Sequence, residues 1–206
     1  MVVVALAVGM AGCSDIPEIV STASPGGSPG VGSGSAVDST SLRGAADRAL
    51  EALRDLEDLD DQSYLTLLEM MDPDEGLVFS PYAYIQDYPI RLDAEEVERL
   101  GATASTTYVW GHWDGSGEPI ELTFADYWER FVWDRDYTAA PLVAENEYQV
   151  GGNTLSNIPE FFGPDAQWVE YAFPSDDHTW SALRLVFREI DGTYRLLGVV
   201  HDQWTI

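Results

Sequence analysis

The residues best suited to hold a ligand are aromatic and lie in the middle of the chain. They are Tyr82, Tyr84, Tyr108, Trp110 and His112. Tyr and Trp combine a large apolar ring with a polar tip, and His adds a hydrogen-bonding nitrogen. In a strand covering 106–110, Tyr108 and Trp110 share one face, and His112 continues it if the strand runs that far. Such a row predicts a pocket for a sugar or an aromatic ligand, and ordinary core packing is the alternative.

Residues with acid, base or nucleophilic chemistry do not form a known catalytic pattern. The histidines are His112, His178 and His201, and the chain has no His-Glu-x-x-His, Cys-x-x-Cys or phosphate-binding Gly loop. His201 and Asp202 are neighbours in sequence, and neighbours on a strand point to opposite faces. Neither Ser80 nor Ser181 lies in a Gly-x-Ser-x-Gly turn. The catalytic residues therefore stay unknown, and we expect each histidine to be structural.

One loop has a superficial likeness to a calcium site. Asp114-Gly-Ser-Gly-Glu118 matches the middle of an EF-hand loop, but His112 and Thr123 then occupy the first and last ligand positions. Calcium requires oxygen at the first position and a bidentate Glu at the last. We expect no metal and no cofactor.

The charge balance excludes several partners. The chain has 36 acidic and 10 basic residues, a formal net charge of -26, and no Lys among its basic residues. Such a chain repels nucleic-acid phosphates and anionic lipid headgroups, so we expect no nucleic acid as a partner. Without Lys, Schiff-base chemistry on a lysine is excluded. The hydrophobic content of 45% and aromatic content of 12% are too high for a wholly disordered chain.

The N-terminus carries a short apolar leader followed by the single cysteine. Residues 1–12 are apolar and small, and Ala11-Gly12-Cys13 resembles the lipobox of bacterial lipoproteins, with Met10 where that family prefers Leu. The resemblance implies that residues 1–12 are a lipoprotein signal peptide and that Cys13 is diacylated and becomes the mature N-terminus. No Lys or Arg precedes the apolar run, which leaves the true start of translation open. The alternative is a buried N-terminal strand with an inert cysteine.

The next segment predicts a flexible tether over residues 13–41. All but three of residues 21–41 are Ser, Thr, Ala, Pro or Gly. This composition buries too little apolar surface to offset the entropy of ordering. Leader, cysteine and tether together predict a lipid-anchored, extracytoplasmic protein of the bacterial cell envelope, with the membrane as a partner through the N-terminal lipid.

Four helices and five strands are expected beyond residue 41. Apolar residues recur with a helical period over 42–59 and 62–71, and two further helices, 93–100 and 124–133, begin at capping pairs formed by Asp93 with Glu96 and by Thr123 with Asp126. Strand-forming residues cover 77–85, 106–110, 167–173, 181–190 and 194–204. Because Pro81 cannot donate to a ladder, 77–85 is predicted as an edge strand or a broken one. Asp191-Gly192 predicts a type I′ hairpin turn.

This order of elements predicts an α+β domain over residues 42–206, with N-terminal helices packed on a curved antiparallel sheet. It resembles the NTF2-like (SnoaL-like, cystatin-type) cone. A smaller all-β barrel with a helical appendage is the alternative. The stretches 79–84, 110–117 and 201–206 also resemble a group of uncharacterised bacterial exported proteins.

Two function classes stay open on the sequence. The first is a surface-tethered, non-enzymatic lipoprotein that binds a small molecule or a protein, since no catalytic spacing is present. The second is a small NTF2-like enzyme of the isomerase or dehydratase type, with an Asp/His base in the cone. A closed pocket holding a His or carboxylate beside a Tyr favours the enzyme, and a filled cone favours the binding protein.

Overall fold

The structure, a computed structural model, describes residues 40–56, 61–87, 89–100, 105–152, 154–175 and 179–204. They belong to one compact unit, Ala36–Ile206. The predicted signal peptide, Cys13, His178 and all of the predicted tether up to residue 39 lie outside the described residues.

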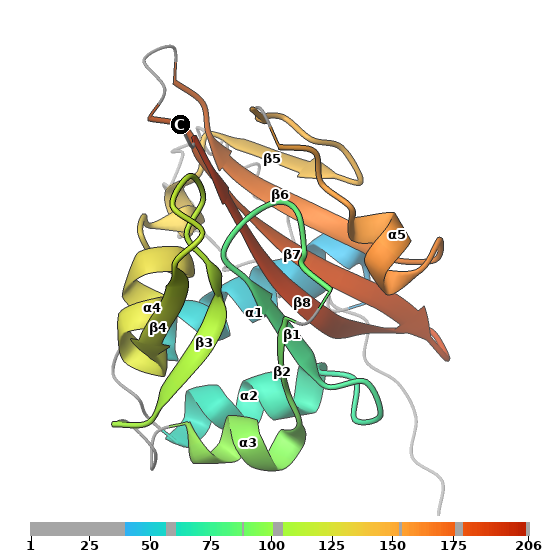
Figure 1. Cartoon of the computed structure of the whole chain (residues 1–206). Helices are drawn as coiled ribbons and strands as arrows, with labels where there is room; N and C mark the ends of the chain where they lie inside the picture. Colours follow the sequence, from blue (N-terminus) through green and yellow to red (C-terminus); the bar gives the residue numbers. More distant parts are fainter. Residues whose placement is uncertain are drawn as a thin grey trace, which may run out of the picture. The chain divides into compact units, whose positions relative to one another are not determined.

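A curved six-stranded sheet forms the centre of this unit (Figure 1). Its strand order is β2 (Ile90–Leu92), β1 (Leu77–Ser80), β8 (Thr193–Gln203), β7 (Ser181–Ile190), β6 (Gln167–Phe173) and β5 (Leu142–Glu145). The β1–β8 pair is parallel and the other neighbours are antiparallel. A separate hairpin consists of β3 (Thr107–His112) and β4 (Pro119–Thr123).

Helices cover both faces of the large sheet. One face packs against α1 (Leu42–Asp55), α2 (Asp61–Met70), α3 (Ala94–Arg99) and α4 (Phe124–Phe131), whereas α5 (Ile158–Phe162) lies on the other, which we call the outer face (Figure 1). A short 3-10 helix, η2 (Tyr137–Ala139), follows α4. These observations confirm the α+β class, with N-terminal helices packed on a curved and mainly antiparallel sheet. The open strand order argues against the all-β barrel.

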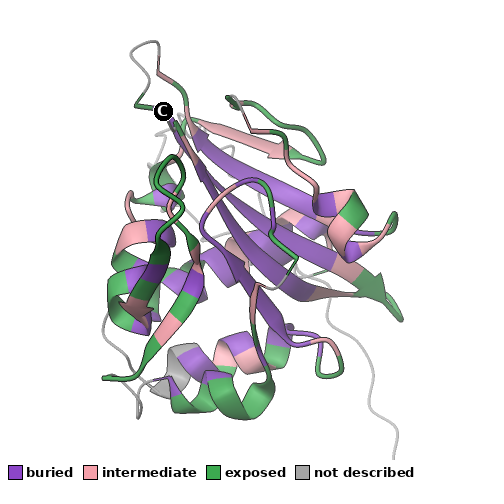
Figure 2. Ribbon diagram, in the orientation of Figure 1, coloured by how far each residue is buried: buried purple, intermediate pink, exposed green. Residues whose placement is uncertain are grey.

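Alternating residues of the long strands belong to two apolar clusters, one on each face of the sheet. Leu183, Leu185 and Phe187 of β7 join the larger cluster on the helix face, and Val186 joins the smaller one beneath α5. Because both faces are covered, β6, β7 and β8 are buried along most of their length, while the edge strand β5 is mostly half-buried and the hairpin tips are exposed (Figure 2).

Local signals in the sequence define several elements well. The capping box of Asp93 and Glu96 is present at α3, and the Thr123 side chain accepts the Asp126 N–H at α4. Asp191 and Gly192 both have positive φ, 52° and 75°, between β7 and β8. These predictions are confirmed.

The prediction for residues 77–85 needs correction. Strand β1 ends at Ser80, one residue before Pro81, and it is not at an edge because β2 pairs with its outer side. Of the two alternatives, the one in which the strand is broken at Pro81 is therefore correct. The sequence reading also missed four short elements, β2, β4, β5 and α5, together with η2.

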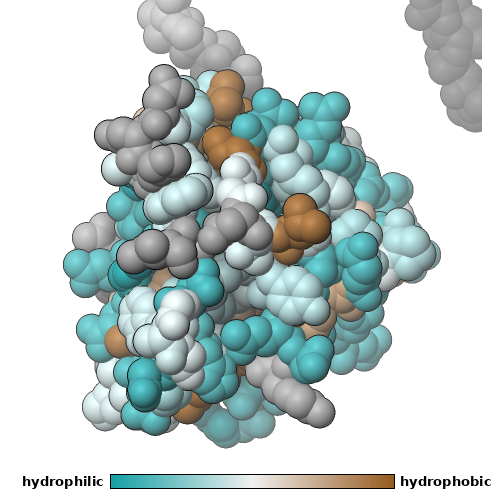
Figure 3. Space-filling model, turned by 45° about the horizontal axis from the view of Figure 1, so that its top comes forward, coloured by the Kyte–Doolittle hydropathy of each residue, from teal (hydrophilic) through white to brown (hydrophobic). Residues whose placement is uncertain are grey.

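The described surface is mostly polar. On the face shown in Figure 3, hydrophilic residues predominate and apolar residues stand in a few separate spots. Among the described residues, no helix combines the length and the apolar character that crossing a bilayer requires.

Candidate ligand-binding site

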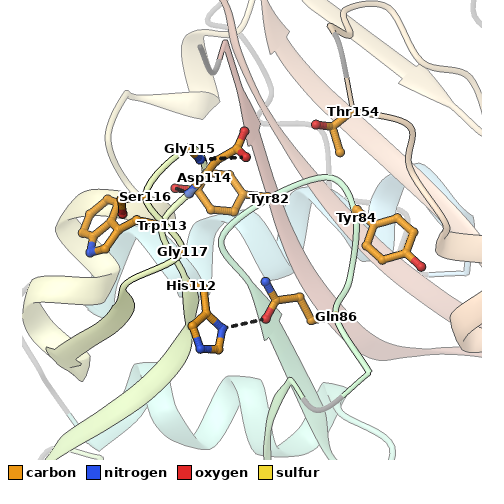
Figure 4. A pocket seen from close by; sticks show the side chains of 10 residues that line it. All are labelled: Tyr82, Tyr84, Gln86, His112, Trp113, Asp114, Gly115, Ser116, Gly117 and Thr154. Atoms are coloured by element: carbon orange, nitrogen blue, oxygen red, sulfur yellow. Dashed lines mark hydrogen bonds between the residues drawn. The ribbon is translucent and has the colours of Figure 1, made fainter.

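A surface hollow of about 530 Å³ lies between three segments that are distant in sequence (Figure 4). One wall is the stretch 81–87 after β1, which we call the aromatic loop. The second is the turn between β3 and β4, and the third is Thr154 from the stretch that precedes α5. The lining residues are Tyr82, Tyr84, Gln86, His112, Trp113, Asp114, Gly115, Ser116, Gly117 and Thr154.

Pro81 ends β1 and redirects the chain into the aromatic loop. The Ser80 hydroxyl donates to the Tyr82 carbonyl at 2.8 Å, and the Nδ1 atom of buried His201 lies 3.2 Å from the Pro81 carbonyl. The Ile85 backbone is held from the opposite side by Asn157. With both ends fixed, Tyr82 points toward the hairpin turn and Tyr84 points away from it, as Figure 4 shows.

The hairpin wall depends on glycine. Gly115 and Gly117 have φ of 83° and 72°, a region that side chains with a Cβ rarely adopt. The Gly117 N–H donates to the Trp113 carbonyl and the Trp113 N–H donates to the Glu118 carbonyl, which closes the turn. No group of three or more potential metal ligands occurs among the described residues.

Polar groups connect the first two walls. The His112 Nδ1 atom lies 3.3 Å from the Gln86 Oε1 atom, and the Asp114 N–H donates to the Tyr82 hydroxyl at 3.4 Å. Burial raises the pKa of Tyr82 above its ordinary value, so its phenol stays protonated at neutral pH. The hollow therefore offers aromatic rings beside neutral and anionic hydrogen-bonding groups.

The Trp113 ring packs against side chains of α4. It lies 5.6 Å from the Phe131 ring, and the Arg130 guanidinium lies 5.9 Å from the Trp113 ring centroid. Arg130 in turn donates to Gln203 at 3.0 Å. These contacts fix the rim of the hollow to α4 and to the end of β8.

The structure separates the five residues that the sequence grouped as a pocket. Tyr82, Tyr84 and His112 line the hollow. Trp110 is only 1% exposed and stacks on Tyr127 with ring centroids 4.0 Å apart, and half-buried Tyr108 packs on Trp110. Trp110 and Tyr108 therefore support the hairpin from the core side.

A β-bulge explains this separation. Val109 pairs with Glu121, but His112 pairs with Pro119, so β3 contains one extra residue at this point. Gly111, with φ of 138°, lies within the bulge. Directly paired residues share a face, and the extra residue therefore places His112 on the face of exposed Val109 rather than that of Trp110. The expected row of Tyr108, Trp110 and His112 is interrupted.

Seven lining residues were not among the five predicted pocket residues: Gln86, Trp113, Asp114, Gly115, Ser116, Gly117 and Thr154. Trp113 and Asp114 lie at the start of the Gly-rich turn, so the prediction of a β-hairpin over residues 107–123 would have placed them beside His112. Gln86 and Thr154 carry no local signal, since only the tertiary fold brings them to this place.

A second group of titratable residues is buried on the helix face. The His201 Nε2 atom lies 3.3 Å from the Asp134 Oδ1 atom, which also accepts the Tyr137 hydroxyl at 2.7 Å. Burial by itself raises the pKa of Asp134, but His201, the Tyr137 hydroxyl and the charge of Arg135 together hold that pKa below its ordinary value.

This group has the residue types that the enzyme alternative requires, and aromatic rings pack around it. The Phe131 ring packs on His201 at 5.7 Å, and the Tyr82 and Tyr127 rings pack on Phe131. His201, Asp134 and Tyr137 do not line the 530 Å³ hollow.

A buried charged triad lies on the outer face of the sheet. Arg184 Nε lies 2.6 Å from Glu170 Oε2, and Arg184 Nη2 lies 2.8 Å from Asp202 Oδ2, with all three side chains at most 6% exposed. Burial raises the pKa of Asp202 against the opposing effect of Arg184. Burial by itself lowers the pKa of Arg184, but Asp202 and Glu170 raise it above its ordinary value.

Comparison with known proteins finds similarity only among solved structures. No family model matches the chain, and no curated protein matches it. Among the solved structures that are similar to this chain, two are informative to name. One is a DUF4783 family protein from Bacteroides ovatus, at 9% identity over 77% of this chain and 94% of that one. The other is a designed protein whose name marks it as NTF2-like, at 12% identity over 77% and 97%. Both TM-scores are 0.30, a value that assigns neither a family nor an activity.

Proposed function

We propose that this protein is a non-enzymatic binding lipoprotein of the bacterial cell envelope and that its ligand is an uncharged saccharide held in the hollow. The observation that carries the proposal is the lining: Tyr82, Tyr84 and Trp113 stand beside the polar side chains of Gln86, His112 and Asp114. Aromatic rings stack on the apolar faces of sugar rings, and amide, imidazole and carboxylate groups bond to hydroxyls.

The charge of the protein narrows the saccharide class. With a net charge of -26, the protein disfavours uronic acids and phosphorylated sugars. The open hollow and the polar surface shown in Figure 3 suit a hydrated ligand better than a lipid. The buried His201 packs on the Phe131 ring and does not line the hollow, which supports binding rather than catalysis at that place.

Replacing Tyr84 with alanine should weaken saccharide binding by about three- to tenfold, because one aromatic contact contributes about 0.5–1.5 kcal/mol. Tyr84 is 52% exposed, so its removal should leave the fold intact. The measurement is calorimetric titration with uncharged gluco-, manno- and N-acetylglucosamine tetrasaccharides, and with a uronic-acid tetrasaccharide as the charged comparison.

The matched control is Tyr194→Ala. Tyr194 is half-buried at the far end of β8 and lines a different, smaller hollow beside Gly192. It should leave the saccharide affinity unchanged. Equal affinities for the parent and Tyr84→Ala, or tighter binding of the uronic acid, would contradict the proposal.

The anchor is tested at Cys13. A Cys13→Ser variant, expressed in a bacterial host fed labelled palmitate, should lose the label and move from the membrane fraction to the soluble fraction. Serine supplies no thiol for acylation, and a diacylated cysteine is the feature that holds such a protein stably at a membrane. Equal labelling of variant and parent would remove the lipoprotein part of the proposal.

A further inference from the structure

Asn157 makes an unusual pair of hydrogen bonds for its position. It is the N-cap residue of α5, yet its side chain makes no capping bond to that helix. Instead its Oδ1 accepts the Ile85 N–H at 2.7 Å and its Nδ2 donates to the Ile85 carbonyl at 3.0 Å. An N-cap Asn commonly satisfies a free N–H of its own helix. Here the whole amide is used on a segment 72 residues away.

Ile85 is well placed to transmit this contact to the hollow. Its side chain is 1% exposed in the apolar cluster with Ile158 and Phe162, while its neighbours Tyr84 and Gln86 are exposed and line the hollow. Fixing both backbone groups of Ile85 fixes the direction of the two residues beside it. Gln86 is then held within reach of His112, as Figure 4 shows.

The stretch that supplies Asn157 is itself tied to the sheet. This stretch, residues 146–152 and 154–157, is called the outer strap. The Glu170 Oε1 atom accepts the N–H groups of Gln149 and Val150 at 2.6 and 3.2 Å, and Arg184 donates to the Val150 carbonyl at 3.3 Å. Farther along, Thr154 forms the third wall of the hollow.

We infer that Asn157 is a positioning residue for the saccharide hollow: its amide clamps the aromatic loop to the outer strap, so that two of the three walls are held as one unit. This inference rests on the proposed function for its ligand. Asn157 does not line the hollow and acts through Ile85.

The test compares Asn157→Ala with Asn157→Asp in the whole chain. Alanine removes both bonds, and aspartate keeps an acceptor for the Ile85 N–H but loses the donor to its carbonyl. Amide hydrogen exchange of Ile85, followed by NMR without ligand, should accelerate at least about tenfold in Asn157→Ala and by less in Asn157→Asp. The dissociation constant for the best uncharged tetrasaccharide should follow the same order, rising about tenfold in the alanine variant.

Gln149→Ala is the matched control, since it shortens an amide side chain on the same strap. Within the part of the chain that the structure describes, the only hydrogen bond of this side chain is a long, exposed one to Glu147 at 3.5 Å. It should change neither the exchange of Ile85 nor the affinity. Parent-like exchange of Ile85 in Asn157→Ala overturns the clamp, and faster exchange with an unchanged dissociation constant overturns its role in binding. Faster exchange in a protein whose parent binds no saccharide supports the clamp and refutes the proposed function instead.

Discussion

Arg184→Ala should lower the free energy of unfolding by about 3–5 kcal/mol at pH 7, the range for breaking a buried ion pair by removing one partner. Arg184 is 1% exposed and is the shared partner of the Glu170 and Asp202 carboxylates. Its removal leaves two buried carboxylates beside each other without a compensating charge. It also removes the donor to Val150 on the outer strap. Urea denaturation monitored by tryptophan fluorescence measures the loss.

The loss should shrink as the pH falls toward about 5. Burial already raises the pKa of Asp202 in the parent, and the loss of Arg184 removes the largest of the effects that oppose this rise. The folded variant then binds a proton more tightly than the unfolded chain, so its stability increases as the pH decreases through the raised pKa. A loss that grows on acidification would contradict this account of the triad.

Two further variants separate charge from packing. Arg48→Ala removes an exposed pair with Glu69, whose side chains are 42% and 67% exposed, and should cost at most about 1 kcal/mol. The triple variant Arg184→Met, Glu170→Gln, Asp202→Asn removes all three charges and should recover most of the stability, because no unpaired charge stays buried. A triple variant less stable than Arg184→Ala would show that packing dominates.

Elements specified by neighbouring residues were predictable from the sequence. Strands β6 and β7 have the predicted bounds, because each is a continuous segment rich in strand-forming residues and β7 runs directly into the Asp191-Gly192 turn. The caps at Asp93 and Thr123 are likewise local, since donor and acceptor lie three residues apart. For the same reason α4 begins at Phe124, as expected.

Elements that depend on distant partners were not predictable. Leu142–Glu145 is half-buried and short, and it becomes β5 only because β6 pairs with it. Ile158–Phe162 is a five-residue helix held by its packing in one apolar cluster with Val186 and Leu197. The bulge at Gly111 depends on how β3 meets β4, and this one residue decides which face His112 occupies.

The same distinction applies to the candidate site. The sequence brought Tyr82, Tyr84 and His112 into one group through aromatic density, and the structure places these three on one hollow. It also grouped Trp110 and Tyr108 with them, because strict alternation along β3 ignores the bulge. Thr154 lines the hollow and Asn157 bonds to Ile85 of the aromatic loop, although both are far from that loop in the sequence. No local sequence pattern predicts such contacts.

Trp110→Ala should lower the free energy of unfolding by about 3–5 kcal/mol, as is typical of removing a buried tryptophan. Trp110 is 1% exposed, stacks on Tyr127 with ring centroids 4.0 Å apart, and meets Phe79 edge-on at 6.0 Å. Its Nε1 donates to the Leu122 carbonyl at 3.0 Å and so ties the two hairpin strands together. Calorimetric melting of the variant and the parent measures the difference.

Trp113→Ala is the natural comparison, because the same residue type lies three positions away on the opposite side of the bulge. Trp113 is half-buried at the rim, so its loss should cost less stability than that of Trp110 and should reduce saccharide affinity directly. Trp110→Ala should keep the parent's affinity at temperatures well below its lowered melting point, because its ring supports the hairpin from within the core. If Trp110→Ala instead melts like the parent and loses saccharide binding, Trp110 contacts the ligand and the aromatic row expected from alternation is the true site.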